Sequence, residues 1–390
     1  MTVFGIDFGT SYSSISAVVG DRVCMIGDEE MRALHPSCVT VADAGAPVAG
    51  WPAREQQLSN PNQTLGSPKR LLGLPFDDEH AAAILHGLPM RGVAAPDGSI
   101  ALTIDHEPYT ITQLCVPIIA HLRDLAERVV HAKVEQAVFS VPLGFDDRRR
   151  AALRRAAQLA GIETIAQIEE PVAAAMAYGF GKQRNEVVAV YDFGGGTFDF
   201  TVIDISGYSF QVLARAGDAW LGGDDFDLSL AKAVADAIWR ATEIEVRDRA
   251  VEWQRLLFGC EQVKRDLSEV DRATLRIKGL IERPKVVNLN QPITRDQLEG
   301  LCGEHVDRSI SLCQQALKQA GLEPDDIAQV VVSGGVSHIP FVREAVAELF
   351  ARPIEAVVDP DIAICVGAGM RAAQLSKKPI RGAGGVLCPH

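Results

Sequence analysis

The chain has 390 residues, 47% hydrophobic and 23% charged, and its formal net charge of −13 accompanies a pI near 5.2. This length and hydrophobic content suffice to bury substantial cores, so at least two domains are expected. The acidic balance argues against nucleic acid or an anionic membrane surface as the main partner, and no apolar run approaches the ~20 residues of a membrane span. The first residues enter a strand pattern directly, which leaves no room for a signal peptide.

The first half of the chain is expected to hold strands, an insertion, and then helices around another strand. Residues 3–26 have the pattern of paired strands, and residues 37–110 are rich in Pro and Gly, with one helical turn near 81–85. The later elements are a helix at 112–131 capped by Thr112, a buried strand at 136–141, and a helix at 146–159 that ends at Gly161.

The second half repeats this plan. It has strands over 187–216, an inserted segment near 223–305, a helix at 308–320 and a strand at 329–333. A Gly-Ala-Gly sequence at 367–369 superficially resembles a dinucleotide fingerprint, but it follows no phosphate-sized loop, so close helix packing accounts for it better.

Eight cysteines are scattered along the chain without C-x-x-C spacing, and neither they nor the nine histidines show the spacing of zinc ligands. Buried free thiols in a reducing cytosol account for them better than disulfides do. We therefore expect a cytoplasmic protein.

Two segments, one in each half, share one design. Val3–Tyr12 and Val190–Asp199 each run from a strand into an Asp, then a glycine turn, then a small hydroxyl residue at the start of a second strand. Turn glycines let backbone N–H groups approach phosphate oxygens, hydroxyls add donors, and carboxylates hold hydrated Mg²⁺. The repeat predicts two related lobes that close on one nucleotide.

A single copy of this design would not identify a nucleotide site. Asp-Phe-Gly also occurs in protein kinases, but a kinase carries it once, after a His-Arg-Asp loop that this chain lacks. Either copy is also compatible with a tight hairpin whose glycines serve only the turn. Recurrence at matching places in two halves favours the nucleotide site over both.

Two further segments carry candidate ligand chemistry. Glu170 stands where a strand runs into an alanine-rich helix, a junction where α/β proteins place ligands, although helix packing alone also accounts for that stretch. Glu261, Lys264, Arg265 and Ser268 fall at i, i+3, i+4 and i+7, hence on one helical face. In an isolated helix such a face is more typical of solvated charge.

Together these motifs resemble the nucleotide-binding domain of the seventy-kilodalton heat-shock chaperones, the DnaK family, from Val3 to about Leu375. The resemblance rests on seven segments in the family's order and at its spacings. They are Gly5–Tyr12, Pro68–Leu71, Glu169–Pro171, Asp192–Asp199, Leu221–Asp227, Cys260–Ser268, and Ser333–Gly335 with Ile339-Pro340. The resemblance implies an α/β protein with the actin-like ATPase fold. In that fold two lobes, each a mixed β-sheet core flanked by helices with an inserted outer subdomain, enclose the nucleotide in a central cleft.

The expected boundaries divide the chain into two lobes and a tail. Lobe I spans 1–183, with its core in 1–36 and 111–183 and its inserted subdomain in 37–110. Lobe II spans 184–378, with its core in 184–222 and 306–378 and its inserted subdomain in 223–305. Residues 379–390 form a tail or the remnant of a linker.

The resemblance implies catalytic roles for four residues. Lys69 reaches the γ-phosphate, where a fixed ammonium offsets charge on the transferring group. Glu170 and Asp192 orient the attacking water, and Thr197 contacts phosphate. A lone Lys is usually only a solvated surface charge, but the neighbours of Lys69 match the family well enough to favour the functional role.

The resemblance also implies the cofactors, which are ATP or ADP with Mg²⁺ and, as in the family, K⁺. Asp7 and Asp192 hold Mg²⁺ through waters. Asp199 belongs to the same acidic cluster, which in the family also accommodates K⁺.

At the adenosine end, the resemblance implies that Glu261 and Lys264 bind ribose hydroxyls, Arg265 stacks on adenine, and Ser268 reads the base edge. Asp361 lies close to the base. The other implied nucleotide contacts come from the glycine turns and from the residues after the last strand. They are Gly9, Thr10, Ser11, Tyr12, Gly194, Gly195, Gly196, Gly222, Gly223, Gly334, Gly335, Val336, Ser337 and His338.

Three substitutions depart from the family. His338 replaces the Arg that normally forms the other side of the adenine sandwich, and a neutral imidazole stacks but lacks a fixed charge. Glu169 stands where Asn is usual, which places a second carboxylate beside the catalytic one. Leu143-Gly144 replaces an Ala-Tyr pair, at a place tied in the family to signalling between domains.

A fourth departure is the end of the chain. The family's peptide-binding domain follows a leucine-rich, acidic linker, whereas residues 376–390 show no such linker, and Val386–His390 only vaguely resembles the first strand of that domain. Either the chain is cut from a longer protein, or it is a shortened relative without a peptide site.

We therefore expect an ATP-binding, slowly ATP-hydrolysing domain of a heat-shock-type chaperone that acts in protein folding and the stress response. The implied partners are a J-domain co-chaperone and a nucleotide exchange factor, with client proteins only if a peptide-binding domain follows, and we expect a monomer. Three other functions stay open: an actin-like filament protein, a small-molecule kinase on the same fold, and a non-hydrolysing nucleotide sensor. The segments Leu221–Asp227 and Glu261–Ser268 count against the filament.

Overall fold

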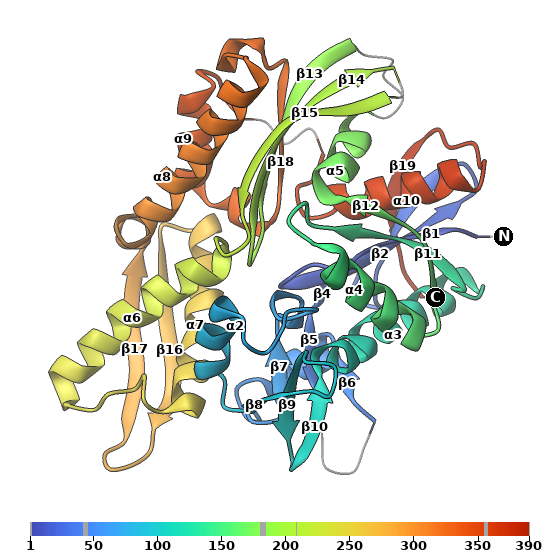
Figure 1. The fold of residues 1–390 in the computed structure, drawn as a ribbon. Helices are drawn as coiled ribbons and strands as arrows, with labels where there is room; N and C mark the ends of the chain where they lie inside the picture. The colour runs from blue at the N-terminus through green and yellow to red at the C-terminus, as the bar shows by residue number, and fades with distance from the viewer. Residues whose placement is uncertain (1, 42–45, 180–184, 208, 355–357, 390) are drawn as a thin grey trace.

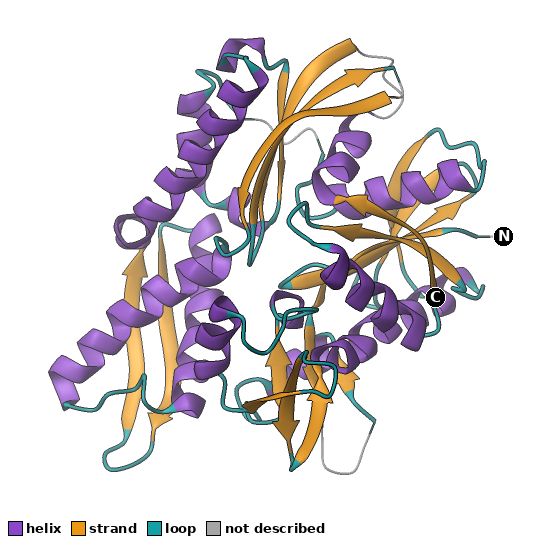
Figure 2. Ribbon diagram, viewed as in Figure 1, coloured by secondary structure: helices purple, strands orange, loops and turns teal. Residues whose placement is uncertain are grey.

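The computed structural model describes residues 2–41, 46–179, 185–207, 209–354 and 358–389. These residues form five β-sheets and ten α-helices, and the two largest sheets are each flanked by helices (Figure 1). Helices and strands are interleaved throughout, so the protein is of the mixed α/β class that the sequence predicts (Figure 2). None of the described helices is long and apolar enough to span a bilayer.

The first large sheet has the strand order β12-β11-β1-β2-β3-β19, and β4 pairs with β2. Strand β1 lies antiparallel to β2 and parallel to β11, and β19 adds a parallel strand at the edge, beside β3. The strands are β1 (Phe4–Asp7), β2 (Tyr12–Val19), β3 (Arg22–Ile26), β4 (His35–Pro36), β11 (Gln136–Val141), β12 (Glu163–Glu169) and β19 (Gly382–Leu387). The helices that pack on it are α3 (Ile111–Val130), α4 (Asp147–Leu159) and α10 (Ala363–Leu375).

The second large sheet has the order β15-β14-β13-β18 and repeats this arrangement. Strand β13 lies antiparallel to β14 and parallel to β18, as β1 does to β2 and β11. Buried aromatic side chains, among them Tyr191, Phe193, Phe198 and Phe200, fill the core beside this sheet. The strands are β13 (Asn185–Phe193), β14 (Phe198–Ser206), β15 (Ser209–Asp218) and β18 (Gln329–Ser333), and the helices packed around them are α5 (Glu170–Gly179), α8 (Arg295–Ala320) and α9 (Pro340–Leu349). The predicted internal repeat is therefore present in the strand pairing.

Smaller sheets occupy the two segments expected to be insertions. The first segment holds β5 (Cys38–Thr40), β6 (Val48–Ala49), β7 (Thr64–Gly66), β8 (Arg91–Ala94), β9 (Ile100–Ile104), β10 (Glu107–Thr110), α1 (Trp51–Gln56) and α2 (Glu79–His86). The second holds α6 (Gly223–Thr242), α7 (Ala250–Glu269), β16 (Arg272–Ile281) and β17 (Val287–Thr294). The division between the lobes at residues 183 and 184 lies outside the described residues, and the lobe boundaries stay predictions.

The expected cap of helix α3 is wrong. The helix begins at Ile111, and Thr110 caps it, because the Thr110 hydroxyl accepts from the backbone N–H of Gln113 at 3.2 Å. The Gln113 side chain accepts in turn from the backbone N–H of Thr110 at 2.8 Å, which completes a capping box. Thr112, the predicted cap, lies inside the helix.

The expected start of helix α8 at residue 308 is also wrong, because the helix begins at Arg295. Gly300 and Gly303 lower the intrinsic helix propensity of its first half. Burial of Leu298 and Cys302 on the core side overrides that preference.

All eight cysteines are free, and seven of them are buried. Burial raises the pKa of Cys38 to about 12 and that of Cys365 to about 12 as well, so these thiols stay protonated at neutral pH. The prediction of buried free thiols is thus confirmed for all but the half-buried Cys388.

The glycines of helix α10 allow close packing, as predicted. A Cβ atom on Gly367 would overlap the main chain of Ala173 in α5, and one on Gly369 would lie 2.6 Å from Oγ of Ser16 in β2. A Cβ on Gly5 in β1 would overlap the main chain of Gly369. Helix α10 therefore touches α5 and the first large sheet through bare backbone.

We expect Gly367→Ala to destabilise the fold by roughly 1–3 kcal/mol or more, because the new methyl group meets main-chain atoms that no rotamer change can move. Gly300→Ala in α8 is the matched control, since its Cβ enters open space and a helical Gly→Ala change gains roughly 0.5–1 kcal/mol. Urea unfolding of both variants measures the free energies. Equal stability of Gly367→Ala and the parent would show that α10 does not pack this tightly.

Candidate nucleotide-binding site

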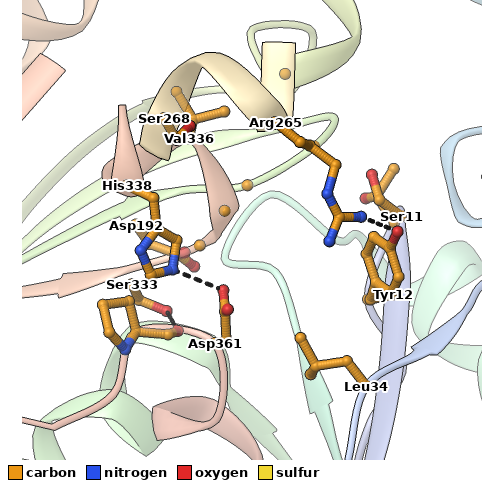
Figure 3. Close-up of a pocket in the computed structure, with 18 of the residues that line it drawn as sticks. Ser11, Tyr12, Leu34, Asp192, Arg265, Ser268, Ser333, Val336, His338 and Asp361 are labelled. Atoms are coloured by element: carbon orange, nitrogen blue, oxygen red, sulfur yellow. Dashed lines mark hydrogen bonds and ion pairs between the residues drawn. The ribbon is translucent and has the colours of Figure 1, made fainter. Parts of the chain in front are cut away.

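A cavity of about 620 Å³ lies where the two large sheets and helix α7 meet, and most of the predicted site residues line it (Figure 3). Those residues are Asp7, Gly9, Thr10, Ser11, Tyr12, Lys69, Glu170, Asp192, Gly194, Gly195, Thr197, Gly223, Glu261, Lys264, Arg265, Ser268, Gly334, Gly335, Val336, His338 and Asp361. Gly196, Gly222, Ser337 and Asp199 are not among the lining residues. The fold thus collects side chains from both halves of the chain around one space.

The two glycine turns meet at the inner end of this cavity. The first joins β1 to β2 and the second joins β13 to β14, so each follows a strand that carries an Asp. A Cβ atom on Gly195 would overlap Oγ of Ser11, and one on Gly196 would lie 2.8 Å from Cγ2 of Thr10. Glycine is required here because the two turns approach each other with bare backbone, an arrangement whose N–H groups suit the predicted phosphate chain.

A buried ion pair lies beside these turns. Nζ of Lys69 donates to Oε1 of Glu170 at 2.7 Å, and the two residues are only 3% and 5% exposed. Lys69 lies in a 3₁₀ turn (Pro68–Arg70), and Glu170 is the first residue of α5, directly after β12. The sequence therefore located both partners, but it did not predict their contact.

Three more carboxylates crowd around this ion pair. Asp192 and Asp199 are cross-strand neighbours in β13 and β14, and Asp7 accepts from the Ser140 hydroxyl at 2.6 Å. Burial, reinforced by the neighbouring carboxylates, raises the pKa of Asp192 well above its ordinary value, and burial raises the pKa of Asp199 to about 8. Burial likewise raises the pKa of Asp7 and of Glu170, and Lys69 opposes both shifts.

Such a cluster suits a cation. Its donors are all oxygens, the kind of ligand that Mg²⁺ and K⁺ prefer over nitrogen or sulfur. One ammonium group cannot neutralise four carboxylates, and burial, the largest cause of their raised pKa values, makes their negative charge costly without a further cation. The residues present therefore fit a hydrated Mg²⁺ ion near Asp7 and Asp192.

Arg149 in α4 supports the loop that carries Lys69, and sequence reasoning did not identify it. Its Nε donates to the main-chain oxygen of Leu72 at 3.1 Å, and its Nη2 donates to those of Lys69 at 3.0 Å and Arg70 at 3.2 Å. The sequence showed only a basic amphipathic helix at this place. A side chain that binds main-chain atoms of a segment far away in the sequence shows no recognisable pattern in its own neighbouring residues.

The predicted adenosine end of the cavity has two polar walls (Figure 3). On one wall the Arg265 guanidinium lies 4.7 Å from the centre of the Tyr12 ring and donates to its hydroxyl. On the other wall Nε2 of His338 lies 3.0 Å from Oδ1 of Asp361. Leu34, which the sequence did not indicate, also lines the cavity.

The four predicted residues of helix α7 share one face, as their spacing indicates, because all four line the cavity. Two of them have other partners as well. Oε2 of Glu261 accepts from Nη2 of Arg54 in α1 at 2.7 Å. Nζ of Lys264 donates to Oδ2 of Asp227 and to the main-chain oxygen of Gly223, both at 2.8 Å. Their ribose contacts stay predictions, made by side chains that also join α7 to α1 and α6.

The four predicted residues outside the lining have identifiable places. A Cβ on Gly222 would lie 2.5 Å from the main chain of Gly195, so this glycine lets α6 approach the second turn. Ser337 donates its hydroxyl to the main-chain oxygen of Gly334 at 2.6 Å within the 3₁₀ turn Gly335–His338. Gly196 packs against the first turn, and Asp199 lines a neighbouring cavity.

Glu169, expected as a second carboxylate beside Glu170, has a partner of its own. Its carboxylate does not line the cavity but accepts from Nη2 of Arg150 at 3.2 Å. Glu169 ends β12 and Glu170 begins α5, and the two adjacent carboxylates have different partners, Arg150 for Glu169 and Lys69 for Glu170.

Comparison with known families agrees with this geometry. A family model described as Hsp70 protein matches residues 3–382. The chain belongs to the Hsp70 family. The match confirms the predicted family and, with it, the actin-like ATPase fold. Hsp70 proteins are in general ATPases that bind ATP or ADP with Mg²⁺, serve chaperone functions, and typically work with J-domain proteins and nucleotide exchange factors.

Because His338 lines the cavity and is titratable, we predict that the affinity for the nucleotide depends on pH. The hydrogen bond to Asp361 raises the pKa of His338 above its ordinary value of 6.5, while partial burial opposes this. A protonated imidazole stacks on adenine as a cation, and that contribution of roughly 0.5–2 kcal/mol is lost as the pH rises through the raised pKa. We expect ADP and ATP to bind the parent more weakly at high pH than near pH 6.5.

Calorimetric titration checks this with two variants. His338→Arg should remove the pH dependence and bind ADP and ATP more tightly at high pH, with little change in hydrolysis. Asp361→Asn should move the transition to lower pH, because it removes the partner that favours the protonated ring. Equal affinities of parent and His338→Arg at every pH would mean that His338 does not face the base.

Proposed function

We propose that this Hsp70 family member binds ATP with Mg²⁺ in the cavity between the two glycine turns and hydrolyses it slowly. The observation that carries the proposal is the buried Lys69–Glu170 ion pair, 2.7 Å long, placed beside both turns and three further carboxylates. Composition alone is consistent with many soluble enzymes. A buried ammonium group among four carboxylates, beside two glycine turns, suits a polyanionic ligand that binds together with a metal cation.

Each residue near the turns has a proposed task. Lys69 holds an ammonium group where charge develops on the transferring phosphoryl group. Glu170 and Asp192 accept hydrogen bonds from the attacking water and so orient it, and Thr197 donates its hydroxyl to phosphate. None of them needs to be a strong base, because positioning and electrostatics dominate phosphoryl transfer.

The cation completes the site. Mg²⁺, when bound, would neutralise phosphate charge and would be held through waters by Asp7 and Asp192, with K⁺ near Asp199. Burial, with a further contribution from neighbouring carboxylates, raises the pKa of Asp192 and of Asp199, so a cation beside them would favour their charged forms.

Ion pairs between the two halves of the chain would form or break with the nucleotide state, so partner proteins could recognise that state. Arg54 pairs with Glu261 at 2.7 Å, and Arg70 in the loop of Lys69 pairs with Asp224 in α6 at 2.8 Å. Closure on ATP would favour these pairs, and reopening would break them. We propose that a J-domain co-chaperone and an exchange factor act on this cycle in the cytoplasm, with clients only if a peptide-binding domain follows.

A non-hydrolysing nucleotide sensor is the second candidate. The departures from the family at His338 and Glu169 favour it, and the Lys69–Glu170 contact is compatible with it because a carboxylate that is held by an ammonium group is less available to a water molecule. The two functions differ in one measurable quantity, the rate of ATP cleavage by the purified protein.

We expect Lys69→Ala to bind ATP almost as well as the parent but to hydrolyse it at least about tenfold more slowly in a single turnover, a barrier increase of about 1.4 kcal/mol or more. Lys133→Ala is the control, because that side chain is 78% exposed and, among the described residues, its ion pair is with Glu127. Binding of a fluorescent ADP analogue reports whether each variant is folded. Unchanged turnover in Lys69→Ala would remove Lys69 from the mechanism, and a parent that does not hydrolyse ATP at all would establish the sensor.

A further inference from the structure

A second cavity of about 320 Å³ adjoins the nucleotide site. Thr197 lines both cavities, so it stands in the wall between them. Gly144, Arg215 and Gly217 at the rim are exposed, whereas Asp199 at the inner end is buried. The second cavity therefore connects solvent with the immediate surroundings of a phosphate-contacting residue.

This cavity is open because position 144 carries no side chain. A Cβ atom built on Gly144 would have Ala219 Cβ, 4.0 Å away, as its nearest neighbour, and the backbone at Gly144 is not in the left-handed region. A side chain at this position would therefore fit without strain and would extend into the free space. The tyrosine that the family resemblance leads one to expect here would fill it.

The charges around the cavity favour a small anion. Arg149 and Arg215 both line it, and among the described residues neither guanidinium has a carboxylate partner within 4.0 Å. Arg149 uses Nε and Nη2 for main-chain oxygens, so its positive charge is not neutralised by those contacts. Of the two carboxylates in the lining, Asp218 is paired with Arg308 at 2.6 Å, and Asp199 is buried at the inner end beside its cross-strand neighbour Asp192.

Because the phosphate end of the nucleotide site is buried, a second opening near that end would have a function. Lys69, Glu170 and Asp192, at the phosphate end, are buried, whereas the His338 side chain at the adenosine end is 39% exposed. A nucleoside diphosphate would therefore stand between the cleaved phosphate and the open end of the site. Phosphate that leaves before the diphosphate needs another path.

We propose that the second cavity is the path and transient binding site by which inorganic phosphate leaves, past Thr197 and between Arg149 and Arg215, while the diphosphate is still bound. This inference rests on the proposed hydrolysis of ATP. No covalent bond changes in this step, because phosphate moves from one set of hydrogen-bond donors to another.

The test separates cleavage from release. In single turnovers, acid quenching measures ATP cleavage and a fluorescent phosphate sensor measures free phosphate. Gly144→Tyr should leave cleavage unchanged and slow phosphate release at least about tenfold, so that bound phosphate accumulates. Gly144→Ala is the matched control, since a methyl group leaves the path open, and it should match the parent in both measurements.

A second variant acts on charge instead of space. Arg215→Gln keeps the cavity open, so it should leave cleavage unchanged, slow the return of labelled phosphate to the ADP-bound protein, and weaken the salt dependence of that return. The proposal would be overturned if Gly144→Tyr released phosphate at the same rate as the parent. It would also be overturned if Arg215→Gln did not alter the salt dependence of phosphate return.

Failure of the proposed ATP hydrolysis can be distinguished from failure of the proposed phosphate path. If the parent does not cleave ATP, the binding of labelled inorganic phosphate to the protein saturated with ADP and Mg²⁺ still tests the path. Gly144→Tyr should then slow phosphate association at least about tenfold relative to Gly144→Ala. Equal association rates of these two variants would show that phosphate does not use this cavity.

Discussion

The buried ion pair between Lys69 and Glu170 is the interaction on which the site depends. Removing a charge from water is costly unless a partner and hydrogen bonds compensate it, and this pair lies among three more carboxylates. The backbone makes the arrangement possible, because Glu170 begins a helix directly after a strand and Lys69 lies in a 3₁₀ turn held by Arg149. A loop fixed in this way positions its ammonium group before any ligand binds, which is the form of preorganisation that phosphoryl transfer requires.

The two large sheets bring this cluster together from distant parts of the chain. In each sheet, the strand that carries the key Asp pairs antiparallel with its successor and parallel with a strand far along the sequence. Helices α5 and α10 pack between the sheets through small residues, and a third core cluster contains residues from both halves. The small residues of this seam let the backbones of α5, α10 and the first sheet approach one another closely.

Local chemistry determines which features can be predicted from the sequence. Neighbouring residues encode three features that the structure contains. They are the spacing of Asp and Gly in the turns, the strand that runs into a helix with Pro in its first turn, and the shared face of α7. The sequence predicts the cap of α3 two residues late because Thr110 and Thr112 offer the same hydroxyl, and only the partner Gln113 decides between them. Arg149, Leu34 and the pair of Arg54 with Glu261 leave no such signal because they depend on tertiary contacts between segments that are far apart in sequence.

The positions of the departures from the family follow a pattern that sequence comparison alone does not show. His338 lines the first cavity, Gly144 lines the second, and Glu169 pairs with Arg150. The residues between them, Lys69, Glu170 and the carboxylate cluster, match the family. Under the proposed function, substitutions that surround an unchanged reaction centre would alter how ligands bind and leave more than how the bond is cleaved. Changes to binding and release would then be sufficient to alter the lifetime of each nucleotide state.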